Sequence, residues 1–375
     1  MTEVFNAIAL TQIANIGTIS AKYLYDTLGS ATAVMENRNN IKDVIPDATL
    51  LLTESLKNVD DAFRIAEQEV EFIEQKNIKP LCMNDEAYPQ RLLNCDDAPI
   101  ILYYCGNADL NAKHIISMVG TRNCSQYGKE LCKSFVADLK ALVPDAVIVS
   151  GLAYGIDVHC HRAALANDMS TIGVVAHGLE KIYPSVHRET ASKMIAKGGI
   201  LTEYIHNTKI EKSNFLKRNR IVAGISDCTI VVESGSHGGS LVTANLANAY
   251  NRDVFAFPGR ISDESSAGCN KFIAENKAQL LISAEELVKT MGWCAPKPVQ
   301  QDLFASAMPA LTEDEQKIVD CLKGFDDKSI NLVVNETGLG YGTVSAIIFE
   351  LEEKGVVTTL GGARIKLNRN VFSIF

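Results

Sequence analysis

The side chains with the clearest chemistry gather in one short basic segment, residues 209–220. It contains a single acid, Glu211, and five basic residues: Lys209, Lys212, Lys217, Arg218 and Arg220. The only aromatic residue among them is Phe215. Basic side chains that follow phosphates, beside a ring on which a base can stack, are a usual means of holding an unpaired nucleic acid. The segment carries +4 in a chain of net charge −9, so the remainder carries −13. This contrast predicts a site for a polyanion.

Each feature of this segment also has an ordinary structural explanation. The charges can form a solvated face, Arg220 can be one half of a structural salt bridge, and Phe215 can be a core residue. We expect Phe215 and its basic neighbours to lie in a short loop that precedes a helix-capable run.

Three apolar segments are each followed by a turn that contains glycine. The turns are VGTRNCSQYG at 119–128, SGLAYGID at 150–157 and SGSHGGS at 234–240. Glycine leaves room for an anionic ligand, and such turns expose backbone N–H groups. The last turn stands between an apolar strand and a helix of small residues that leads to a second apolar strand, which is a βαβ unit. Open α/β sheets bind ligands at the carboxyl ends of their strands, so we expect the turns to form one phosphate- or nucleotide-lined crevice.

The elements that must position these turns form an α/β domain, residues 78–292. Strands are predicted near 100–104, 115–119, 146–149, 171–175, 199–202, 229–232 and 254–257. Helical patterns separate most of them, which is typical of a doubly wound, mostly parallel, Rossmann-like sheet.

Residues 1–75 predict a small helical domain of the SAM or helix-hairpin-helix type. Gly17 falls in the turn of the hairpin, and Asn15 stands where such turns usually have their first glycine. Hairpins of this kind present backbone N–H groups to a phosphate. A degenerate helical domain without DNA contact is an equal alternative.

Residues 293–309 are proline-rich and aperiodic, which predicts a linker. The linker includes QQDLF, from Gln300 to Phe304, which resembles the short peptide that bacterial proteins use to dock on the replicative sliding clamp. Residues 310–375 predict three helices and a β-hairpin, which together make a winged helix. Its would-be recognition helix carries Glu350, Glu352 and Glu353. Carboxylates repel phosphates, so we expect this domain to contact protein instead of the major groove.

Length and composition set the broad class. With 375 residues, 47% hydrophobic and 22% charged, the chain is an ordinary globular protein of two or three domains. No apolar run approaches the roughly 18 residues of a membrane helix, and the first residues lack the basic lead of a signal peptide. The 10 cysteines form no C-x-x-C pair, so neither a disulfide framework nor a zinc site is indicated. We expect a cytoplasmic protein with reduced thiols.

Common cofactor and catalytic motifs do not occur in the sequence. Gly120 and Gly128 lack the G-x-G-x-x-G spacing of a dinucleotide fingerprint, and there is no P-loop. No G-x-S-x-G elbow occurs either. Asp157, His159 and His161 are two residues apart on an expected helix and do not share a face. His161 is therefore expected to be structural, and we expect no metal and no cofactor.

Five motifs taken together resemble the DNA-processing protein A (DprA/Smf) family. They are VGTR-x-x-S-x-YG, SGLA-x-GID, GLE-x-x-YP, F-x-x-RNRI-x-AG-x-SD and GGSLVTA, in the family's order and spacing along nearly the whole chain. The resemblance implies a protein that binds single-stranded DNA as a homodimer, formed through the Rossmann-like domain, without catalysis. It further implies that the protein shields incoming strands during natural transformation and loads the RecA recombinase onto them.

The same motifs indicate which residues border the single-strand pocket. Lys212 and Phe215 fall where the family has a DNA-contacting lysine and a pocket aromatic residue, and Gly151 is expected to approach the DNA backbone closely. The full set of expected binding residues is Gly120, Arg122, Ser125, Gly151, Lys212, Phe215, Arg218, Arg220, Gly239 and Ser240.

One class of enzyme shares this kind of sheet and its glycine-rich turns. These are the nucleotide hydrolases of the lysine-decarboxylase-like (phosphoribohydrolase) class, whose GG-x-GT-x-x-E turn carries the glutamate that does the chemistry. The corresponding stretch here, GGSLVTANL at 238–246, has no glutamate. A non-catalytic protein that binds single-stranded DNA is therefore the leading hypothesis, and a hydrolase is the alternative.

Overall fold

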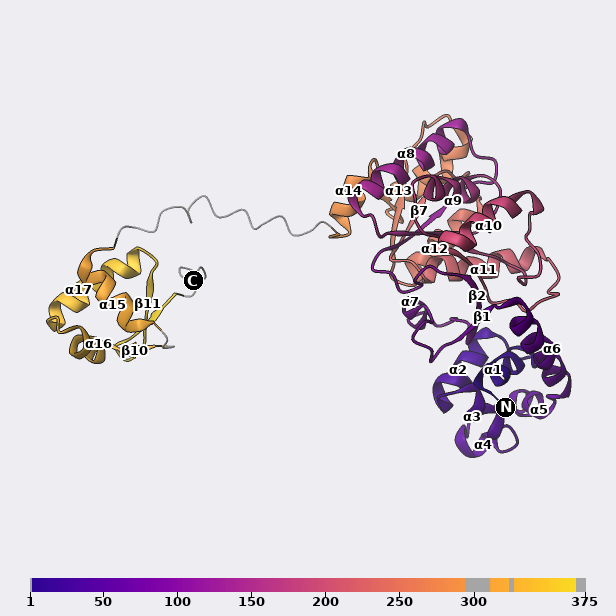
Figure 1. Cartoon of the computed structure of the whole chain (residues 1–375), viewed down its shortest axis with the longest axis horizontal. Helices are drawn as coiled ribbons and strands as arrows, with labels where there is room; N and C mark the ends of the chain where they lie inside the picture. The colour runs from indigo at the N-terminus through magenta and orange to yellow at the C-terminus, as the bar shows by residue number, and fades with distance from the viewer. Residues whose placement is uncertain (1, 294–310, 324–326, 369–375) are drawn as a thin grey trace. The chain divides into compact units, whose positions relative to one another are not determined.

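The computed structural model describes residues 2–293, 311–323 and 327–368. The chain divides into two compact units, Met1–Trp293 and Cys294–Phe375, and Figure 1 shows the elements of each. The predicted linker lies outside the described residues except for Trp293, and so does the clamp-like stretch from Gln300 to Phe304.

The first unit begins with helices only, as expected for residues 1–75. They are α1 (Glu3–Gln12), α2 (Thr18–Leu28), α3 (Ala31–Glu36), α4 (Ile41–Val44), α5 (Leu50–Lys57) and α6 (Asp60–Lys76). Helices α1 and α2 form the predicted hairpin. Asn15 takes the left-handed conformation (φ 65°) in its turn, which asparagine tolerates better than most residues, and Gly17 is the N-cap of α2. Asn15 thus adopts the left-handed conformation for which such turns usually have a glycine.

Nine strands form one sheet in the order β1-β2-β6-β5-β4-β3-β7-β8-β9. Neighbours from β6 to β9 are parallel, whereas β2 and β1 pair antiparallel at one edge. This arrangement confirms the predicted doubly wound, mostly parallel sheet. The strands are β1 (Lys79–Cys82), β2 (Ile101–Gly106), β3 (Ile115–Val119), β4 (Val147–Ser150), β5 (Thr171–Val174), β6 (Gly199–Thr202), β7 (Cys228–Val231), β8 (Asp253–Ala256) and β9 (Gln279–Leu280).

Strands β2 to β8 match the predicted positions, whereas β1 and β9 are additional. Both additional strands lie at the edges of the sheet. β1 contains Pro80, and proline in sheets is confined to edges because it cannot donate to the ladder. β9 has only two residues, both exposed. Neither strand carries the continuous apolar run that identifies a buried parallel strand in a sequence.

Helices pack on both faces of the sheet. Val147 and Val149 of β4 face one core, and Ile148 between them faces the other, which is the alternation of a strand. Ile221 of α11 and Ala244 of α12 belong to the first core, while α8, α9 and α14 contribute to the second. The helices are α7 (Gln90–Leu93), α8 (Gln126–Leu142), α9 (Ile156–Ala166), α10 (Arg188–Lys197), α11 (Lys212–Gly224), α12 (Gly239–Ala249), α13 (Ala267–Ala274) and α14 (Ala284–Thr290), with 3-10 turns at Ser185–His187 and Glu264–Ser266.

The expectation of a short loop around Phe215 is wrong. Helix α11 begins at Lys212, so Phe215 lies in its first turn. Arg218, Ile221 and Val222 are buried at the three- and four-residue spacing of a helix face. An arginine at a buried position obscures this pattern in the sequence. The basic side chains therefore stand on a helix that is packed against the sheet.

The second unit contains three helices and a small sheet, as predicted for a winged helix. Its elements are α15 (Glu313–Leu322), β10 (Lys328–Ser329), α16 (Ile330–Thr337), α17 (Tyr341–Glu353), β11 (Val357–Leu360) and β12 (Arg364–Leu367). The sheet has the order β10-β12-β11, and the two-residue strand β10 is an addition to the prediction. In the part of the chain that is described, no single helix meets the length and hydropathy criteria of a membrane span; only the bent pair α16 and α17, at 112° to each other, passes when taken together.

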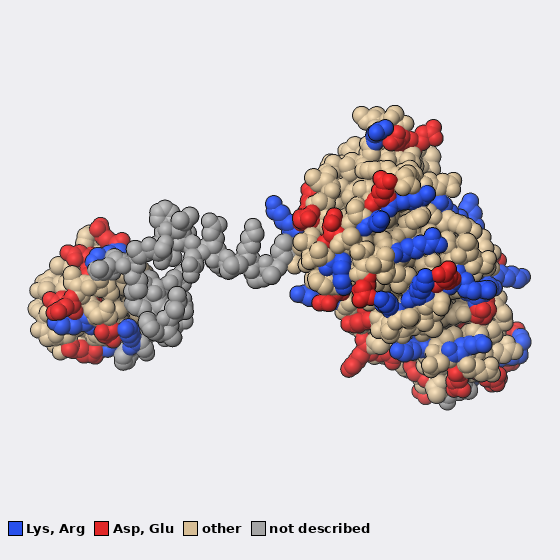
Figure 2. Space-filling model, turned by 45° about the horizontal axis from the view of Figure 1, so that its top comes forward, with Lys and Arg blue, Asp and Glu red and all other residues tan. Residues whose placement is uncertain are grey.

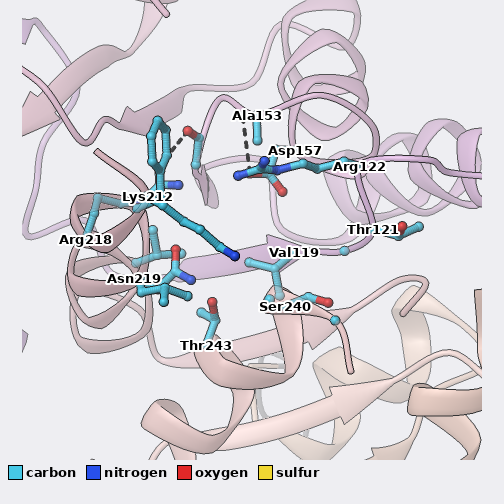
Figure 3. Close-up of a pocket in the computed structure, with 17 residues that line it drawn as sticks. Val119, Thr121, Arg122, Ala153, Asp157, Lys212, Arg218, Asn219, Ser240 and Thr243 are labelled. Atoms are coloured by element: carbon cyan, nitrogen blue, oxygen red, sulfur yellow. Dashed lines mark hydrogen bonds between the residues drawn. The ribbon is translucent and has the colours of Figure 1, made fainter. Parts of the chain in front are cut away.

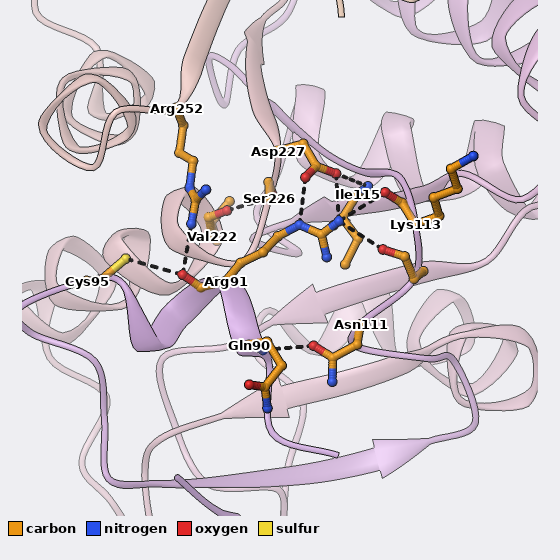
Figure 4. Close-up of polar contacts among 11 residues, drawn as sticks. Gln90, Arg91, Cys95, Asn111, Lys113, Ile115, Val222, Ser226, Asp227 and Arg252 are labelled. Atoms are coloured by element: carbon orange, nitrogen blue, oxygen red, sulfur yellow. Dashed lines mark hydrogen bonds and ion pairs between the residues drawn. The ribbon is translucent and has the colours of Figure 1, made fainter. Parts of the chain in front are cut away.

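An ion pair between Arg91 of α7 and Asp227, the residue before β7, lies at the amino-terminal ends of β3 and β7 (Figure 4). Arg91 donates from Nε and Nη2 to the two oxygens of Asp227, at 2.7 and 3.0 Å. It also donates to the carbonyls of Ala112 and Lys113, at 3.0 Å each. Asp227 accepts from the backbone N–H of Ile115 at 2.7 Å. The cluster lies at the ends of these strands opposite the glycine turns, so we assign it to stability.

Replacing Asp227 with alanine should lower the free energy of unfolding by about 2–4 kcal/mol, because a mostly buried guanidinium loses its carboxylate. Urea unfolding measures this change. Glu189→Ala is the control, because it breaks an exposed pair with Lys193 and should cost no more than about 0.5 kcal/mol. Equal effects of the two substitutions would contradict the stabilising role of the Arg91–Asp227 pair.

Candidate nucleic-acid interface

A cavity of about 410 Å³ opens beside the carboxyl ends of β3 and β4 and at the start of α12. The sheet has its switch point here, because β4 lies on one side of β3 and β7 on the other. Open α/β sheets bind their ligands at such points. The cavity is lined by Val119, Gly120, Thr121, Arg122, Gly151, Ala153, Asp157, Lys212, Phe215, Leu216, Arg218, Asn219, Val222, Gly238, Gly239, Ser240 and Thr243. All the expected binding residues except Ser125 and Arg220 are among them.

Two basic side chains, Arg122 and Lys212, extend into this cavity from opposite sides (Figure 3). Arg122 belongs to the turn after β3, and Lys212 is the first residue of α11. Both residues are exposed, and neither has a carboxylate partner within the described ranges. Figure 2 shows many lysine and arginine side chains, with acidic side chains among them, on one face of the Met1–Trp293 unit, although the chain as a whole is acidic. Uncompensated cations that converge on a cavity suit a phosphate group.

The N-terminus of α12 adds backbone donors to the same cavity. Gly238 is the N-cap, and no side chain caps the helix. A Cβ atom on Gly239 would meet nothing within 4 Å, so the first turn borders open space. The hydroxyl of Ser240 donates to Ser234 Oγ at 2.8 Å, which holds this turn in place. Unpaired N–H groups at the positive end of a helix dipole favour an anion.

The N-terminus of α8, at the same edge of the sheet, is already filled by a carboxylate of the chain. Glu233, which follows β7 and is 1% exposed, accepts from the backbone N–H of Ser125 at 2.8 Å and from its hydroxyl at 2.5 Å. Ser125 Oγ in turn accepts from the N–H of Gly128 at 3.1 Å, so Ser125 is the N-cap of α8. Ser125 therefore serves α8 and does not line the cavity. Sequence reasoning missed Glu233, whose signal was a lone acid directly after an apolar strand.

Phe215 lies between a cation and a second aromatic ring at the edge of the cavity. The Cζ atom of Arg122 is 5.8 Å from the centre of the Phe215 ring. The ring centre of Tyr183 is 5.9 Å away, with the ring planes at 55°. Phe215 is half-buried and belongs to none of the hydrophobic cores among the described residues. Rings and guanidinium planes both offer surfaces for stacking a base.

Arg218 forms part of the cavity wall. It is 3% exposed, and its Nη1 donates to the carbonyls of Gly151, at 2.6 Å, and Val174. Asp157 lies close by, and a Cβ on Gly151 would come within 2.6 Å of both charged groups. Burial raises the pKa of Asp157, and the charge of Arg218 opposes that shift. A side chain at 151 would therefore displace the Arg218 guanidinium or the Asp157 carboxylate from its present position.

Arg220 lies outside the cavity, on another face of α11. It forms an ion pair with Glu203, and its Nε lies 4.0 Å from Asp97. Arg220 is 8% exposed. Burial raises the pKa of Glu203, and the Arg220 charge opposes this effect. This geometry is that of the structural salt bridge which was the alternative to a DNA contact.

His161 is a buried structural residue, as expected. Its Nδ1 and the hydroxyl of Thr171 are 2.7 Å apart, and burial lowers the pKa of His161 to about 3, which keeps the ring neutral. Across the ranges that the structure describes, no three histidine, cysteine, aspartate or glutamate side chains are grouped to hold a metal ion.

The sequence of the chain matches two family models. The one described as DNA recombination-mediator protein A covers residues 79–292, more than half of the chain, and the one described as the DprA winged helix domain covers residues 304–363. Protein Smf of Escherichia coli is 30% identical over 365 residues, which are 94% of this chain and 94% of that protein. DNA processing protein DprA of Streptococcus pneumoniae is 39% identical over 204 residues, 54% of this chain and 71% of that protein.

Two solved structures agree with this assignment. The X-ray structure of DprA from Streptococcus pneumoniae has a TM-score of 0.63 at 30% identity and covers 77% of this chain and 98% of that chain. DNA processing protein A from Helicobacter pylori, whose structure is described as revealing a single-stranded DNA binding mode, has a TM-score of 0.52 at 29% identity, covering 58% of this chain and 96% of its own. The chain therefore belongs to the DprA/Smf family of DNA recombination-mediator proteins.

Proposed function

We propose that this protein binds single-stranded DNA in the cavity at the carboxyl edge of its sheet. The observation that carries the proposal is the convergence of Arg122, Lys212 and the uncapped N-terminus of α12 on one cavity that also holds Phe215. Cations and backbone N–H groups contact phosphates, while the ring stacks a base. The single-stranded DNA binding mode described for the Helicobacter pylori relative supports this assignment.

Stacking on Phe215 requires an unpaired base. In a duplex the base faces are covered by their neighbours, and exposing one costs a few kcal/mol. A ring and a pair of cations read no base edge, so binding should be tolerant of sequence. We therefore propose that the protein covers single strands in general and protects them.

We further propose that the bound strand is handed to a RecA-type recombinase and that the protein acts as a homodimer through the Rossmann-like domain. The description of the family as recombination mediators supports the first statement. We propose that the winged helix contacts protein. Its would-be recognition helix, α17, carries Glu350, Glu352 and Glu353, and their carboxylates would repel the phosphates of DNA. Natural transformation is the process in which such a mediator would meet incoming strands.

A nucleotide hydrolase remains the alternative because one carboxylate, that of Asp157, lines the cavity. Its position argues against a catalytic role. Asp157 is 8% exposed, accepts from the backbone N–H of Ala153 at 3.3 Å and lies close to Arg218. Incubation of the protein with AMP tests the alternative: release of adenine would establish hydrolysis, and unchanged AMP is expected.

The salt dependence of binding should be modest, because Arg122 and Lys212 are the only cations without a carboxylate partner or a buried contact among the described residues that line the cavity. Each phosphate contact to a single strand contributes about −0.7 to the slope of log K against log salt, so two contribute about −1.4, or about sevenfold weaker binding between about 50 and 200 mM salt. Fluorescence anisotropy with a labelled oligonucleotide measures the slope. A slope near zero would contradict phosphate binding by these two residues.

Phe215→Ala should weaken binding of oligo-dT, oligo-dC and oligo-dA alike by about 1–3 kcal/mol, because one stacking surface is removed. Phe215→Tyr is the matched control and should retain most of the affinity, since the ring remains. Wild-type affinity of the alanine variant would assign Phe215 a purely structural role.

Charge reversal at Lys212 or Arg122 should weaken binding about tenfold or more, because a charge-assisted contact to phosphate is replaced by repulsion. The melting temperature should stay near that of the wild type, since both side chains are exposed. Lys133→Glu, at an exposed position on α8, controls for the change of net charge. A large fall in the melting temperature together with the loss of binding would show that these residues stabilise the fold.

A further inference from the structure

An exposed aromatic side chain stands next to the cavity without lining it. Tyr183, in the segment between β5 and α10, is 47% exposed. Its ring centre is 5.9 Å from that of Phe215, which is the spacing of two rings in direct contact, so no base fits between them. Phe215 is half-buried and has Arg122 over its ring. Of the two rings, Tyr183 therefore has more open surface for stacking.

The backbone of Tyr183 is anchored by a buried histidine. His177 is 0% exposed; its Nδ1 donates to the carbonyl of Gly178 at 2.8 Å, and its Nε2 accepts from the N–H of Tyr183 at 3.2 Å. Only the neutral ring can do both, and burial lowers the pKa of His177. The anchor uses the main chain of Tyr183, so the side chain is left available. A residue whose main chain is fixed before binding loses less conformational entropy when a base stacks on its ring.

Tyr183 lies beyond the cavity along the same edge of the sheet. The neighbouring strands β7, β3, β4 and β5 are parallel, so their carboxyl ends lie at one edge. The cavity is lined from the turns after β3 and β4 and from α12, while Tyr183 comes from the loop after β5, one strand further on. A single-stranded DNA segment with a phosphate at α12 and a base on Phe215 would reach Tyr183 with its next nucleotide.

We propose that Tyr183 is a second stacking platform, which binds the nucleobase adjacent to the one held in the cavity. This inference rests on the proposed function and extends it: the DNA would stack one base on Phe215 and the adjacent base on Tyr183. The platform recognises any base through its π-face, so it lengthens the bound segment without adding sequence preference.

Binding of labelled oligo-dT to alanine and phenylalanine variants tests the platform. Tyr183→Ala should weaken binding about 5- to 100-fold, the range expected for one lost stacking contact, whereas Tyr183→Phe should stay within about twofold. Tyr341→Ala, which removes a tyrosine that is 54% exposed on α17, is the matched control and should bind like the wild type. If the wild type binds and Phe215→Ala weakens binding, but Tyr183→Ala does not, the second platform is overturned while the proposed function stands. If the wild type itself does not bind, the proposed function fails.

A direct optical readout separates stacking from an indirect effect on Phe215. The chain has a single tryptophan, Trp293. In a Trp293→Phe background, Tyr183→Trp places the only indole at the proposed platform. Its fluorescence should be quenched as oligo-dT is added, in step with the anisotropy change, while the emission of Trp293 in the wild type should not respond. Binding by anisotropy with unchanged emission from the indole at 183 would overturn the proposal.

Discussion

The carboxyl edge of the sheet depends on one buried guanidinium, that of Arg218. Burying a charge costs several kcal/mol unless hydrogen bonds and an opposite charge compensate it. Arg218 donates from Nη1 to the carbonyls of Gly151 and Val174 and has Asp157 close by, while its buried Nε has no hydrogen-bond partner among the described residues. These contacts fix α11 against the ends of β4 and β5. Phe215 precedes Arg218 by one helical turn and shares its side of the helix, so the same contacts hold the ring at the edge of the cavity.

A second constraint is that carboxylates of the chain already occupy some of the helix N-termini at this edge. The start of α8 is filled by Glu233, which accepts from Ser125, and Asp157 occupies the first turn of α9. The start of α12 has no side-chain cap and borders the cavity. Internal carboxylates thus take the places where nucleotide-binding sheets of this type hold their phosphates. The N-terminus of α12, beside Arg122 and Lys212, is left without a carboxylate of the chain.

Much of this arrangement can be read from the sequence, and the remainder depends on partners that are distant along the chain. Continuous apolar runs identify the buried parallel strands, and the glycine turns after them predict the edge at which the cavity lies. The helical position of Phe215 was not predictable in the same way, because the buried residue of its face is an arginine. Ser125 meets its carboxylate partner 108 residues away, and Arg220 meets its partner 17 residues away. A sequence shows that a side chain is polar or charged, but not whether the fold already satisfies it.

The number of basic side chains that the fold leaves unpaired limits how strongly one cavity can hold DNA. Of the five basic residues in the segment 209–220, Arg218 and Arg220 are committed to buried contacts, and Lys209 and Lys217 do not line the cavity. Lys212 therefore acts there with Arg122. Two phosphate contacts at about 1.5–3 kcal/mol each, and one stacked base at about 1–3 kcal/mol, are opposed by the cost of ordering the strand and of association. One cavity alone therefore gives weak binding. Two cavities on one strand act together, because the first contact raises the effective concentration of the strand at the second. On this argument a homodimer would raise the affinity if it placed two such cavities on one DNA strand.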